Sequence, residues 1–388
     1  MIRRWTMMIF ALIFVLSNSY HTFAKDKDES LTIRSQAAAV LDSTTGTVLY
    51  QKNGNKKMYP ASLTKIATAI YAIEKGKLDD KVTVSKNAAS VDGTRVYLDE
   101  GEVVTLKHLL QGMLINSGND AAIAVAEHID GSVPKFAEHI NAYLKKQIGV
   151  KHTHFVNPNG LYDPEHYTTA NDLAKITNYA MKNETFRQIF GTKQLKWNGE
   201  SWNTTLYTHH RMLKGEIPYK GITGGKTGFV NESGHTLATT AQSSNIHLTV
   251  ITMDAIYKKN AYKDTKTLLD YGFSHFKTIK VPKGSMFTKG KKKYEANKDL
   301  FFTKNLSTSV KEEVEKNGLL KIVDKTGDVI DEFPLSEKKV HAAQGDLPHK
   351  GKKEDSDLHS SIMVSAVSIM LFFMTTLFIR KLIRKIKR

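Results

Sequence analysis

The chain has 388 residues, of which 40% are hydrophobic, and it carries a net charge of +17 without a single cysteine. This length and composition allow one large hydrophobic core and a smaller second unit, so we expect two folded domains. The lack of cysteine excludes disulfides, zinc–thiolate sites and cysteine nucleophiles.

Both ends of the sequence carry targeting signals. Residues 1–24 combine two arginines, the apolar run WTMMIFALIFVL and a small-residue ending at Ala24, which is typical of a cleaved signal peptide. The uncharged run 362–379 is just long enough to span a bilayer as a transmembrane helix, and the basic tail 380–388 follows it. By the positive-inside rule we expect a single-pass protein of the cell membrane, with this tail in the cytoplasm and the main part facing outward.

The positive charge narrows the class of partner. Without the +2 of Arg3 and Arg4 and the +6 of residues 362–388, the exported part keeps a net charge of +9. For an outward-facing protein this charge fits an anionic envelope polymer or lipid headgroups, and a solvated lysine-rich surface is an equally good interpretation. We therefore expect contact with the cell membrane and no nucleic-acid partner.

The first half of the chain predicts two strands and then helices. Residues 36–53 read as two strands joined by a turn. The segment YPASLTKIATAI (59–70) opens a helix with an apolar face that stops at Gly76. Two further apolar helices are predicted at 105–115 and 120–130, and the loop NSGND between them is enclosed by hydrophobic segments.

Later segments predict a return to strands. Thr169 and Asp172 have the spacing of a capping box, which opens a helix that runs to about Met181. Residues 224–255 predict two or three strands, and residues 257–273 predict a helix that packs on them.

These elements divide the exported part into two predicted domains. We expect a mixed α/β domain at 33–276 and a small β-rich domain at 277–335, where short alternating runs and Lys/Gly turns prevail. Residues 336–361 are too polar to bury a core, so we interpret them as a linker to the membrane.

The helix that begins near Ser62 carries unusual chemistry. Lys65 lies one helical turn after Ser62, so both side chains share one face among small and apolar neighbours. A lone S-x-x-K is weak, because a helix cap followed by a solvent-reaching lysine gives the same pattern. Burial and a helix N-terminus both disfavour an ammonium, and buried lysines can reach a pKa of ~5–6. A neutral amine beside a hydroxyl is a general base beside a nucleophile.

Two further triplets complete a pattern. Ser117-Gly118-Asn119 offers a hydroxyl and an amide on the enclosed loop, and Lys226-Thr227-Gly228 opens a strand with a cation and a hydroxyl. S-x-x-K, S-x-N and K-T-G, in this order on helix, loop and strand, resemble the signature of penicillin-binding proteins and serine β-lactamases.

The resemblance narrows to one family. The segment HTHFVNPNGLYDPEHYTTANDLA (152–174) and the helix end LLDYGF (268–273) are similar to those of the serine D-alanyl-D-alanine carboxypeptidases, the low-molecular-mass penicillin-binding proteins. The resemblance covers roughly residues 33–335. It implies a transpeptidase-like α/β fold with a small C-terminal β-rich domain and membrane attachment, and as substrate the D-Ala-D-Ala end of a peptidoglycan stem peptide.

The resemblance also implies roles for the motif residues. Ser62 would be the acylated nucleophile and Lys65 its base, while Ser117 and Asn119 would relay the proton to the leaving D-alanine and position the substrate amide. β-Lactam antibiotics would be covalent inhibitors that acylate Ser62. No metal or cofactor is implied.

Substrate binding is implied for the strand motif. Lys226 and Thr227 would hold the terminal carboxylate, and Gly228 lets the substrate backbone approach closely because it lacks Cβ. The backbone N–H groups of Phe229 and Ser62 would form the oxyanion hole.

Some features depart from the family pattern or admit other interpretations. His210 stands where the family has an asparagine, and GITGGKTG is richer in glycine than usual, which affects details of substrate contact. The histidine pairs at 152/154 and 209/210 could bind metal but have no third ligand at suitable spacing. Glu165 could activate a deacylating water as in class A β-lactamases, although a surface acid is the better interpretation because its context differs.

The sequence leaves the following functions open. The first is an envelope carboxypeptidase that trims D-alanine, with a β-lactamase as its variant, and the second is a wall-binding or penicillin-binding protein without turnover. A second Lys-Thr-Gly triplet, at 325–327, is expected to be an inert hairpin tip, because Asp324 and Asp328 flank it and would repel a carboxylate.

Overall fold

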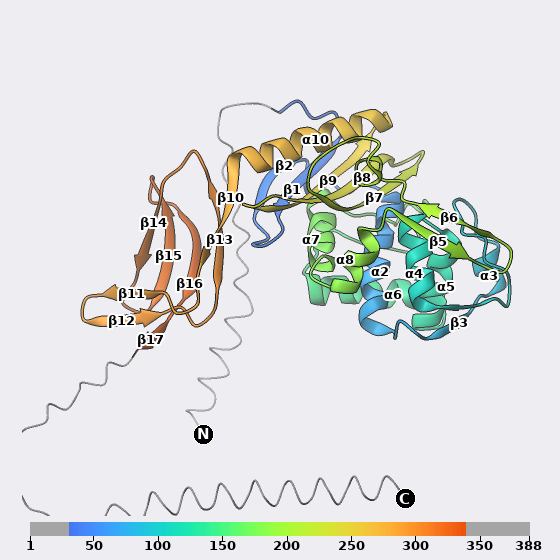
Figure 1. The fold of residues 1–388 in the computed structure, drawn as a ribbon, viewed down its shortest axis with the longest axis horizontal. Helices are drawn as coiled ribbons and strands as arrows, with labels where there is room; N and C mark the ends of the chain where they lie inside the picture. The colour runs from blue at the N-terminus through green and yellow to red at the C-terminus, as the bar shows by residue number, and fades with distance from the viewer. Residues whose placement is uncertain (1–30, 339–388) are drawn as a thin grey trace, which may run out of the picture. The chain divides into compact units, whose positions relative to one another are not determined.

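An antiparallel five-stranded sheet forms the centre of the fold in this computed structural model, which describes residues 31–338 (Figure 1). Its strands are, in spatial order, β2 (Val48–Lys52), β1 (Ala37–Asp42), β9 (His247–Ala255), β8 (Gly234–Gln242) and β7 (Ile222–Val230). β1 is buried along its whole length. Its run AAAVL is small and apolar, as in a strand covered on both faces, and the buried Asp42 that ends it accepts from Thr303 Oγ1 at 2.8 Å. β7 is an edge strand, so one side of its backbone is open to pairing.

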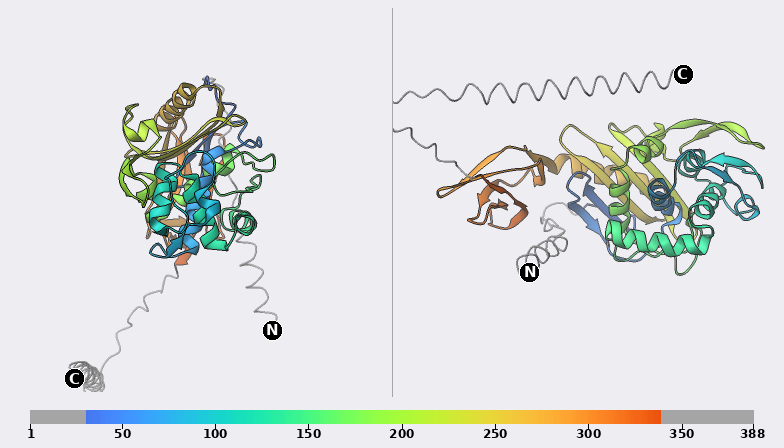
Figure 2. Two further views of the ribbon diagram at one scale, coloured as in Figure 1. Left: turned by 90° about the vertical axis from the view of Figure 1, so that its right-hand side faces the viewer. Right: turned by 90° about the horizontal axis from the view of Figure 1, so that it is seen from below.

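Helices cover both faces of this sheet (Figure 2). One helical layer contains α2 (Thr64–Lys75), α4 (Leu106–Ile115), α5 (Asn119–Asp130), α6 (Val133–Tyr143), α7 (Ala170–Ala180) and α8 (Glu184–Phe190). The opposite face is covered by α10 (Lys258–His275). The two faces have separate hydrophobic clusters, the larger one around Ile66 and Leu110 and the smaller one around Leu237 and Leu268. The first turn of α2 is therefore buried between the sheet and the other helices of its layer.

Short elements connect these layers. They are η1 (Ala61–Leu63), α3 (Lys86–Ala89), η2 (Leu144–Ile148), α9 (Arg211–Lys214), and the strand pairs β3 (Lys81–Thr83) with β4 (Val103–Thr105) and β5 (Gln194–Asn198) with β6 (Asn203–Tyr207). η1 leads directly into α2 with no residue between them, so the two form one continuous helical segment.

The predicted elements of this part are present, with small differences. The segment 224–255 contains three strands, and α5 begins at Asn119, so the enclosed loop is shorter than the sequence predicts. The capping box at Thr169 is formed only by half. Thr169 Oγ1 accepts from Asp172 N–H at 3.1 Å, whereas the Asp172 carboxylate accepts from His152 N–H at 2.7 Å, because it fastens the preceding loop to the helix.

The last part of the described chain is all β. Its strands are β10 (Phe276–Val281), β11 (Met286–Lys289), β12 (Lys292–Glu295), β13 (Leu300–Asn305), β14 (Val310–Val314), β15 (Leu319–Asp324), β16 (Val329–Pro334) and β17 (Ser336–Lys338). They enclose a hydrophobic cluster of their own around Tyr294 and Phe302. β17 corrects one expectation, because it falls in the predicted linker 336–361 and pairs with β12; backbone pairing with an edge strand needs no apolar side chains, so composition did not reveal it.

The second Lys-Thr-Gly triplet lies at a hairpin tip, as predicted. Lys325 is exposed in the turn between β15 and β16, where Gly327 has φ +89°. The Thr326 hydroxyl donates to the carboxylates of Asp324 and Asp328 at 2.6 and 2.9 Å. Both acids therefore face this triplet, which leaves no place for a substrate carboxylate.

Several predictions concern residues outside the described range. These are the signal peptide 1–24, most of the linker, the transmembrane helix 362–379 and the basic tail 380–388. Within residues 31–338, no helix is long and apolar enough to cross a membrane.

Candidate active site

The pair Ser62 and Lys65 lies at the junction of η1 and α2. Lys65 is fully buried, and its Nζ donates to Asn119 Oδ1 and to the carbonyl oxygen of Asn159, both at 2.7 Å. The same Nζ lies 2.9 Å from Ser62 Oγ. Neither carbonyl-type acceptor can donate a proton in return, so in a neutral amine they take both N–H groups and leave the nitrogen lone pair for the Ser62 hydroxyl proton. This is the geometry of a general base beside a nucleophile.

The charge state of Lys65 follows from its surroundings. Burial, and after it the positive charge of Lys226, hold the pKa of Lys65 well below its usual range, while Asp120 acts in the opposite direction. The sequence predicted a lowered pKa from the helix N-terminus and the apolar wall; burial is the leading cause, and the second lysine was not anticipated. The amine form needed for proton abstraction is thus favoured.

Ser117 and Asn119 lie where the loop between α4 and α5 meets the sheet. Ser117 Oγ accepts from Lys226 Nζ at 2.8 Å. Asn119 connects Lys65 to the segment that follows α3, because its Nδ2 donates to the carbonyl of Asp92 at 2.6 Å. Ser117 has φ +68° and Ala61, immediately before Ser62, has φ +49°. Such backbone conformations cost non-glycine residues of order 1–3 kcal/mol and are concentrated at functional sites.

The triplet at 226–228 lies on the edge strand β7, beside Ser62. Lys226 is buried, and burial lowers its pKa to about 7. A Cβ on Gly228 would lie 2.9 Å from the backbone nitrogen of Ser62, so only glycine lets β7 pass so close to the nucleophile. Thr227 is half-buried on the same strand, and Phe229 is 53% exposed at the rim. The structure thus brings all the predicted site residues into one region.

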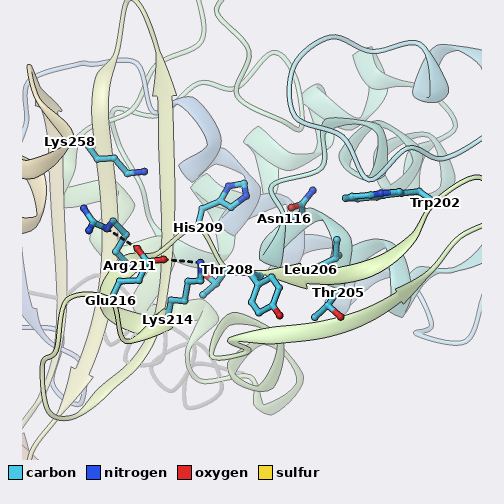
Figure 3. Close-up of a pocket in the computed structure, with 11 residues that line it drawn as sticks. Asn116, Trp202, Thr205, Leu206, Thr208, His209, Arg211, Lys214, Glu216 and Lys258 are labelled. Atoms are coloured by element: carbon cyan, nitrogen blue, oxygen red, sulfur yellow. Dashed lines mark hydrogen bonds and ion pairs between the residues drawn. The ribbon is translucent and has the colours of Figure 1, made fainter.

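A cavity of about 530 Å³ opens next to this region (Figure 3). Its lining comprises Asn116, Trp202, Thr205, Leu206, Tyr207, Thr208, His209, Arg211, Lys214, Glu216 and Lys258. Asn116 directly precedes Ser117 and is the first residue of the enclosed loop, so the cavity adjoins the start of this loop. Cationic side chains from α9 and from the start of α10 project into it.

Comparison with known proteins identifies the family. The family model of the D-alanyl-D-alanine carboxypeptidases matches residues 22–256, which include all residues of the three motifs. The chain is 32% identical over 364 residues to the D-alanyl-D-alanine carboxypeptidase DacF of Bacillus subtilis, a match that covers 84% of this chain and 91% of that protein. The chain belongs to this family.

Further relatives of this carboxypeptidase family support the same fold. The carboxypeptidase DacA of Haemophilus influenzae is 33% identical over 305 residues, which is 72% of this chain and 73% of that protein. The crystal structure of penicillin-binding protein 5 from Haemophilus influenzae is 28% identical and superposes with a TM-score of 0.70 over 79% of this chain and 97% of that chain. The predicted penicillin-binding-protein-like α/β fold is confirmed.

The segment on which the family resemblance rested contains residues whose roles the sequence did not reveal. The Asn159 carbonyl binds Lys65, and the Pro158 carbonyl accepts from Thr68 Oγ1 at 2.7 Å, so this segment wraps the first turns of α2. His166 is buried with Nε2 2.8 Å from Thr64 Oγ1, and burial lowers its pKa to about 3. A backbone carbonyl leaves no trace in side-chain chemistry, so only the quoted motif could have pointed to it.

The two departures from the family pattern are in contact. His210 is buried, its Nδ1 accepts from Leu213 N–H at the start of α9, and its Nε2 lies 2.8 Å from Thr239 Oγ1. A Cβ on Gly225 would lie only 2.3 Å from a carbon of the His210 ring. The additional glycine therefore makes room for the histidine ring.

The alternative chemistries have little structural support. Across the described part of the chain, no group of three or more His, Asp or Glu side chains is placed to hold a metal ion. Glu165 is exposed, and its backbone N–H donates to Asp163 Oδ1 at 2.8 Å. Its position is that of a surface acid in a turn.

Proposed function

We propose that this chain removes the terminal D-alanine from peptidoglycan stem peptides through an acyl-enzyme on Ser62. The observation that carries the proposal is the buried Lys65 amine, held by two carbonyl-type acceptors at 2.7 Å with its remaining valence 2.9 Å from Ser62 Oγ. The relatives named D-alanyl-D-alanine carboxypeptidases and the structural likeness to a penicillin-binding protein support the substrate class.

Acylation begins with proton transfer from Ser62 to Lys65. Ser62 Oγ attacks the carbonyl carbon of the penultimate D-alanine, and the resulting oxyanion accepts from the backbone N–H groups of Ser62 and Phe229. Collapse of this intermediate breaks the C–N bond. The proton held by Lys65 passes to the leaving amine through Ser117, whose Oγ lies 2.8 Å from Lys226 Nζ. Lys65 is then neutral again, and free D-alanine departs.

Deacylation repeats these steps with water. The water oxygen attacks the ester carbonyl, Lys65 accepts its proton, and the C–O bond to Ser62 breaks as the proton returns to Oγ. The peptide then leaves with a new C-terminal carboxylate. No oxidant, metal or cofactor enters the atom balance of either half-reaction.

The substrate lies along the open edge of β7 in this proposal. An extended peptide can add to an edge strand through backbone hydrogen bonds. Lys226 and Thr227 then hold the terminal carboxylate, with Gly228 allowing close approach and Asn119 positioning the substrate amide. Because Lys226 is buried and its pKa is near 7, an incoming carboxylate favours its charged form.

A D-Ala-D-Ala peptide tests the proposal directly. Detergent-solubilised full-length protein should release free D-alanine, and the Ser62→Ala variant should not. Release that persists in this variant would remove Ser62 as the nucleophile, and no release from the wild type would leave the wall-binding or penicillin-binding alternative.

A β-lactamase is the alternative within the same scaffold. Rapid hydrolysis of penicillin needs a group that activates the deacylating water, and the candidate Glu165 is exposed in a turn. We therefore expect penicillin to remain attached as an inhibitor.

We also propose that the chain is exported and anchored at the outer face of the cell membrane by 362–379. The basis is the sequence alone: the signal peptide pattern at 1–24 and the basic tail after the apolar run. A chain truncated before Ile362 should appear in the soluble fraction with full activity, and its retention in membranes at high salt would contradict the anchor.

A further inference from the structure

The cavity beside the active site has a distinct charge. We refer to it as the cationic pocket, defined by Arg211, Lys214, Lys258 and Glu216 among its lining residues (Figure 3). Arg211 Nε and Lys214 Nζ share the Glu216 carboxylate at 2.9 and 2.8 Å. Among the described residues Glu216 is the one acid that lines the pocket, so three cations face a single negative charge.

The positive charge of the pocket extends toward Lys226 in the active site. His209, which lies in the pocket lining, has its pKa lowered to about 4, first by burial and then by the charges of Lys226, Lys258, Lys214 and Lys65. One histidine thus lies within the field of both the pocket and the active site. A cation entering the pocket is therefore repelled by Lys214 and Lys258 and, closer to Ser117, by Lys226 in its charged form, whereas an anion is attracted.

Within the proposed function, the pocket adjoins the leaving-group end of the substrate. In the proposed function, the scissile carbonyl lies at the N–H groups of Ser62 and Phe229, while the terminal carboxylate lies at Lys226. The residue that departs is therefore at the Lys226 end, next to Ser117. The pocket opens at Asn116, which directly precedes Ser117, and its other wall is formed by the residues around His209.

The group that attacks the acyl-enzyme must enter from the same end. Attack of an amine on the ester is the reverse of the step in which the D-alanine amine left, so an acceptor amine occupies the place of the leaving group. Amines with an ordinary pKa reach the site mostly as ammonium ions at neutral pH. Water carries no charge and is not affected by the field.

We propose that the cationic pocket selects the nucleophile that resolves the acyl-enzyme, admitting water and amines that carry a carboxylate and excluding amines with a net positive charge. This inference rests on the proposed function and deepens it, because it makes hydrolysis rather than cross-linking the main outcome. With water, the C–O bond to Ser62 is replaced by a bond to the water oxygen; with an amine, it is replaced by a C–N bond and one amine proton is released.

Two small acceptors separate the charge effect from reactivity. Glycine and glycinamide have the same backbone, but glycine carries a carboxylate whereas glycinamide is a cation when protonated. The full-length protein is given a D-Ala-D-Ala peptide with either acceptor at pH 7, and the ratio of aminolysis to hydrolysis product is measured by mass spectrometry. Each acceptor is compared only with itself across variants, so intrinsic amine reactivity and the overall rate cancel.

The variants remove single charges from exposed positions. Lys258→Gln and Lys214→Gln change side chains that are exposed, so they leave the core untouched. Lys259→Gln is the matched control, because Lys259 is exposed beside Lys258 but lies over the Tyr257 ring, 5.8 Å from its centroid, and does not line the pocket.

The expected result is a change for the cationic acceptor alone. Lys258→Gln and Lys214→Gln should each raise the glycinamide ratio by at least about threefold, while the glycine ratio stays level or falls. For Lys259→Gln, any change in either ratio should be at most about half of the rise in the glycinamide ratio expected for the pocket variants. Added salt should raise the wild-type glycinamide ratio, because ~0.1 M salt screens charges beyond ~10 Å.

The contrary results are distinct. An unchanged glycinamide ratio in both pocket variants would overturn the inference, and an equal rise for both acceptors would replace it by simple steric opening. A wild-type protein that forms neither hydrolysis nor aminolysis product would contradict the proposed function itself.

Discussion

The contact between His210 and Gly225 makes a sharp prediction about how β7 is positioned. In Gly225→Ala the new Cβ would lie 2.3, 2.5 and 2.6 Å from three atoms of the His210 ring. This ring is fixed by the Leu213 N–H at 3.1 Å and by Thr239 Oγ1 at 2.8 Å. Because the ring cannot turn away without losing both contacts, we expect a loss of about 1–3 kcal/mol in unfolding free energy, as for overpacked cores.

The same substitution should also disturb the site. Gly225 immediately precedes Lys226, so a displaced strand moves the Lys226 ammonium relative to Ser117 Oγ, now 2.8 Å away. We expect slower acylation by penicillin together with the loss of stability. Urea unfolding and the second-order acylation rate measure the two effects separately.

A double-mutant cycle tests the stated cause. His210→Asn removes the ring but keeps a residue that caps helices well, so α9 should retain its first turn. The double variant with Gly225→Ala should have an unfolding free energy about 0.5–3 kcal/mol higher than additive losses from the two single variants would give. This is the usual range of coupling for residues in contact.

The adjacent glycine provides the control for this cycle. A Cβ on Gly224 would lie 2.3 Å from Cδ1 of Phe190 instead, so His210→Asn should not relieve Gly224→Ala. The reasoning is refuted if Gly225→Ala is as stable as the wild type, or if His210→Asn rescues both alanine variants alike.

Three further predictions concern the lysines and the buried histidines. Lys65→Arg supplies a basic group that cannot deprotonate, so penicillin acylation should fall by at least ~10²-fold, and a near-normal rate would exclude Lys65 as the base. Lys226→Ala should cost about 2–4 kcal/mol in kcat/KM for a D-Ala-D-Ala peptide, while the hairpin-tip variant Lys325→Ala should stay within about twofold; equal losses would contradict the site assignment. His166 and His210 are buried and neutral with a pKa of about 3 each, and the unfolded chain takes up their protons near ~6.5. The unfolding free energy should therefore fall as pH drops below ~6.5, by up to ~1.4 kcal/mol per pH unit for each histidine. In urea unfolding, His210→Asn should make this dependence on pH shallower. An unchanged slope would contradict the neutral state of His210.

Much of the site could be predicted from sequence because its chemistry lies in short motifs. Ser62 and Lys65 are one helical turn apart, so local geometry alone brings them together. Lys226 and Gly228 belong to one strand. That this strand lies beside the helix of Ser62 and Lys65 was implied only by the resemblance to a family. The helices and strands themselves could be predicted from the spacing of apolar residues, because each kind of element has its own local repeat.

The remaining features depend on contacts between distant segments. The carbonyl of Asn159 binds Lys65 across 94 positions of sequence, and a backbone atom has no signature in residue type. Asp120 is buried, with its carboxylate accepting from Val96 N–H at 2.9 Å, and this contact with a distant segment is not visible in the residue type. The His210 ring filled a space that only the fold defines. β17 was missed because strand pairing at an edge uses the backbone rather than an apolar pattern.

The central claim is that Ser62 is acylated by a D-Ala-D-Ala-like carbonyl with Lys65 as base. Intact-mass measurement of the full-length protein after brief exposure to penicillin, followed by peptide mapping, tests it most directly. We predict a mass increase of one penicillin that persists over many minutes and maps to the peptide containing Ser62, and no increase in Ser62→Ala. An adduct that is absent, or that maps to another residue, would contradict the claim, and a rapid return to the unmodified mass would make the protein a β-lactamase instead.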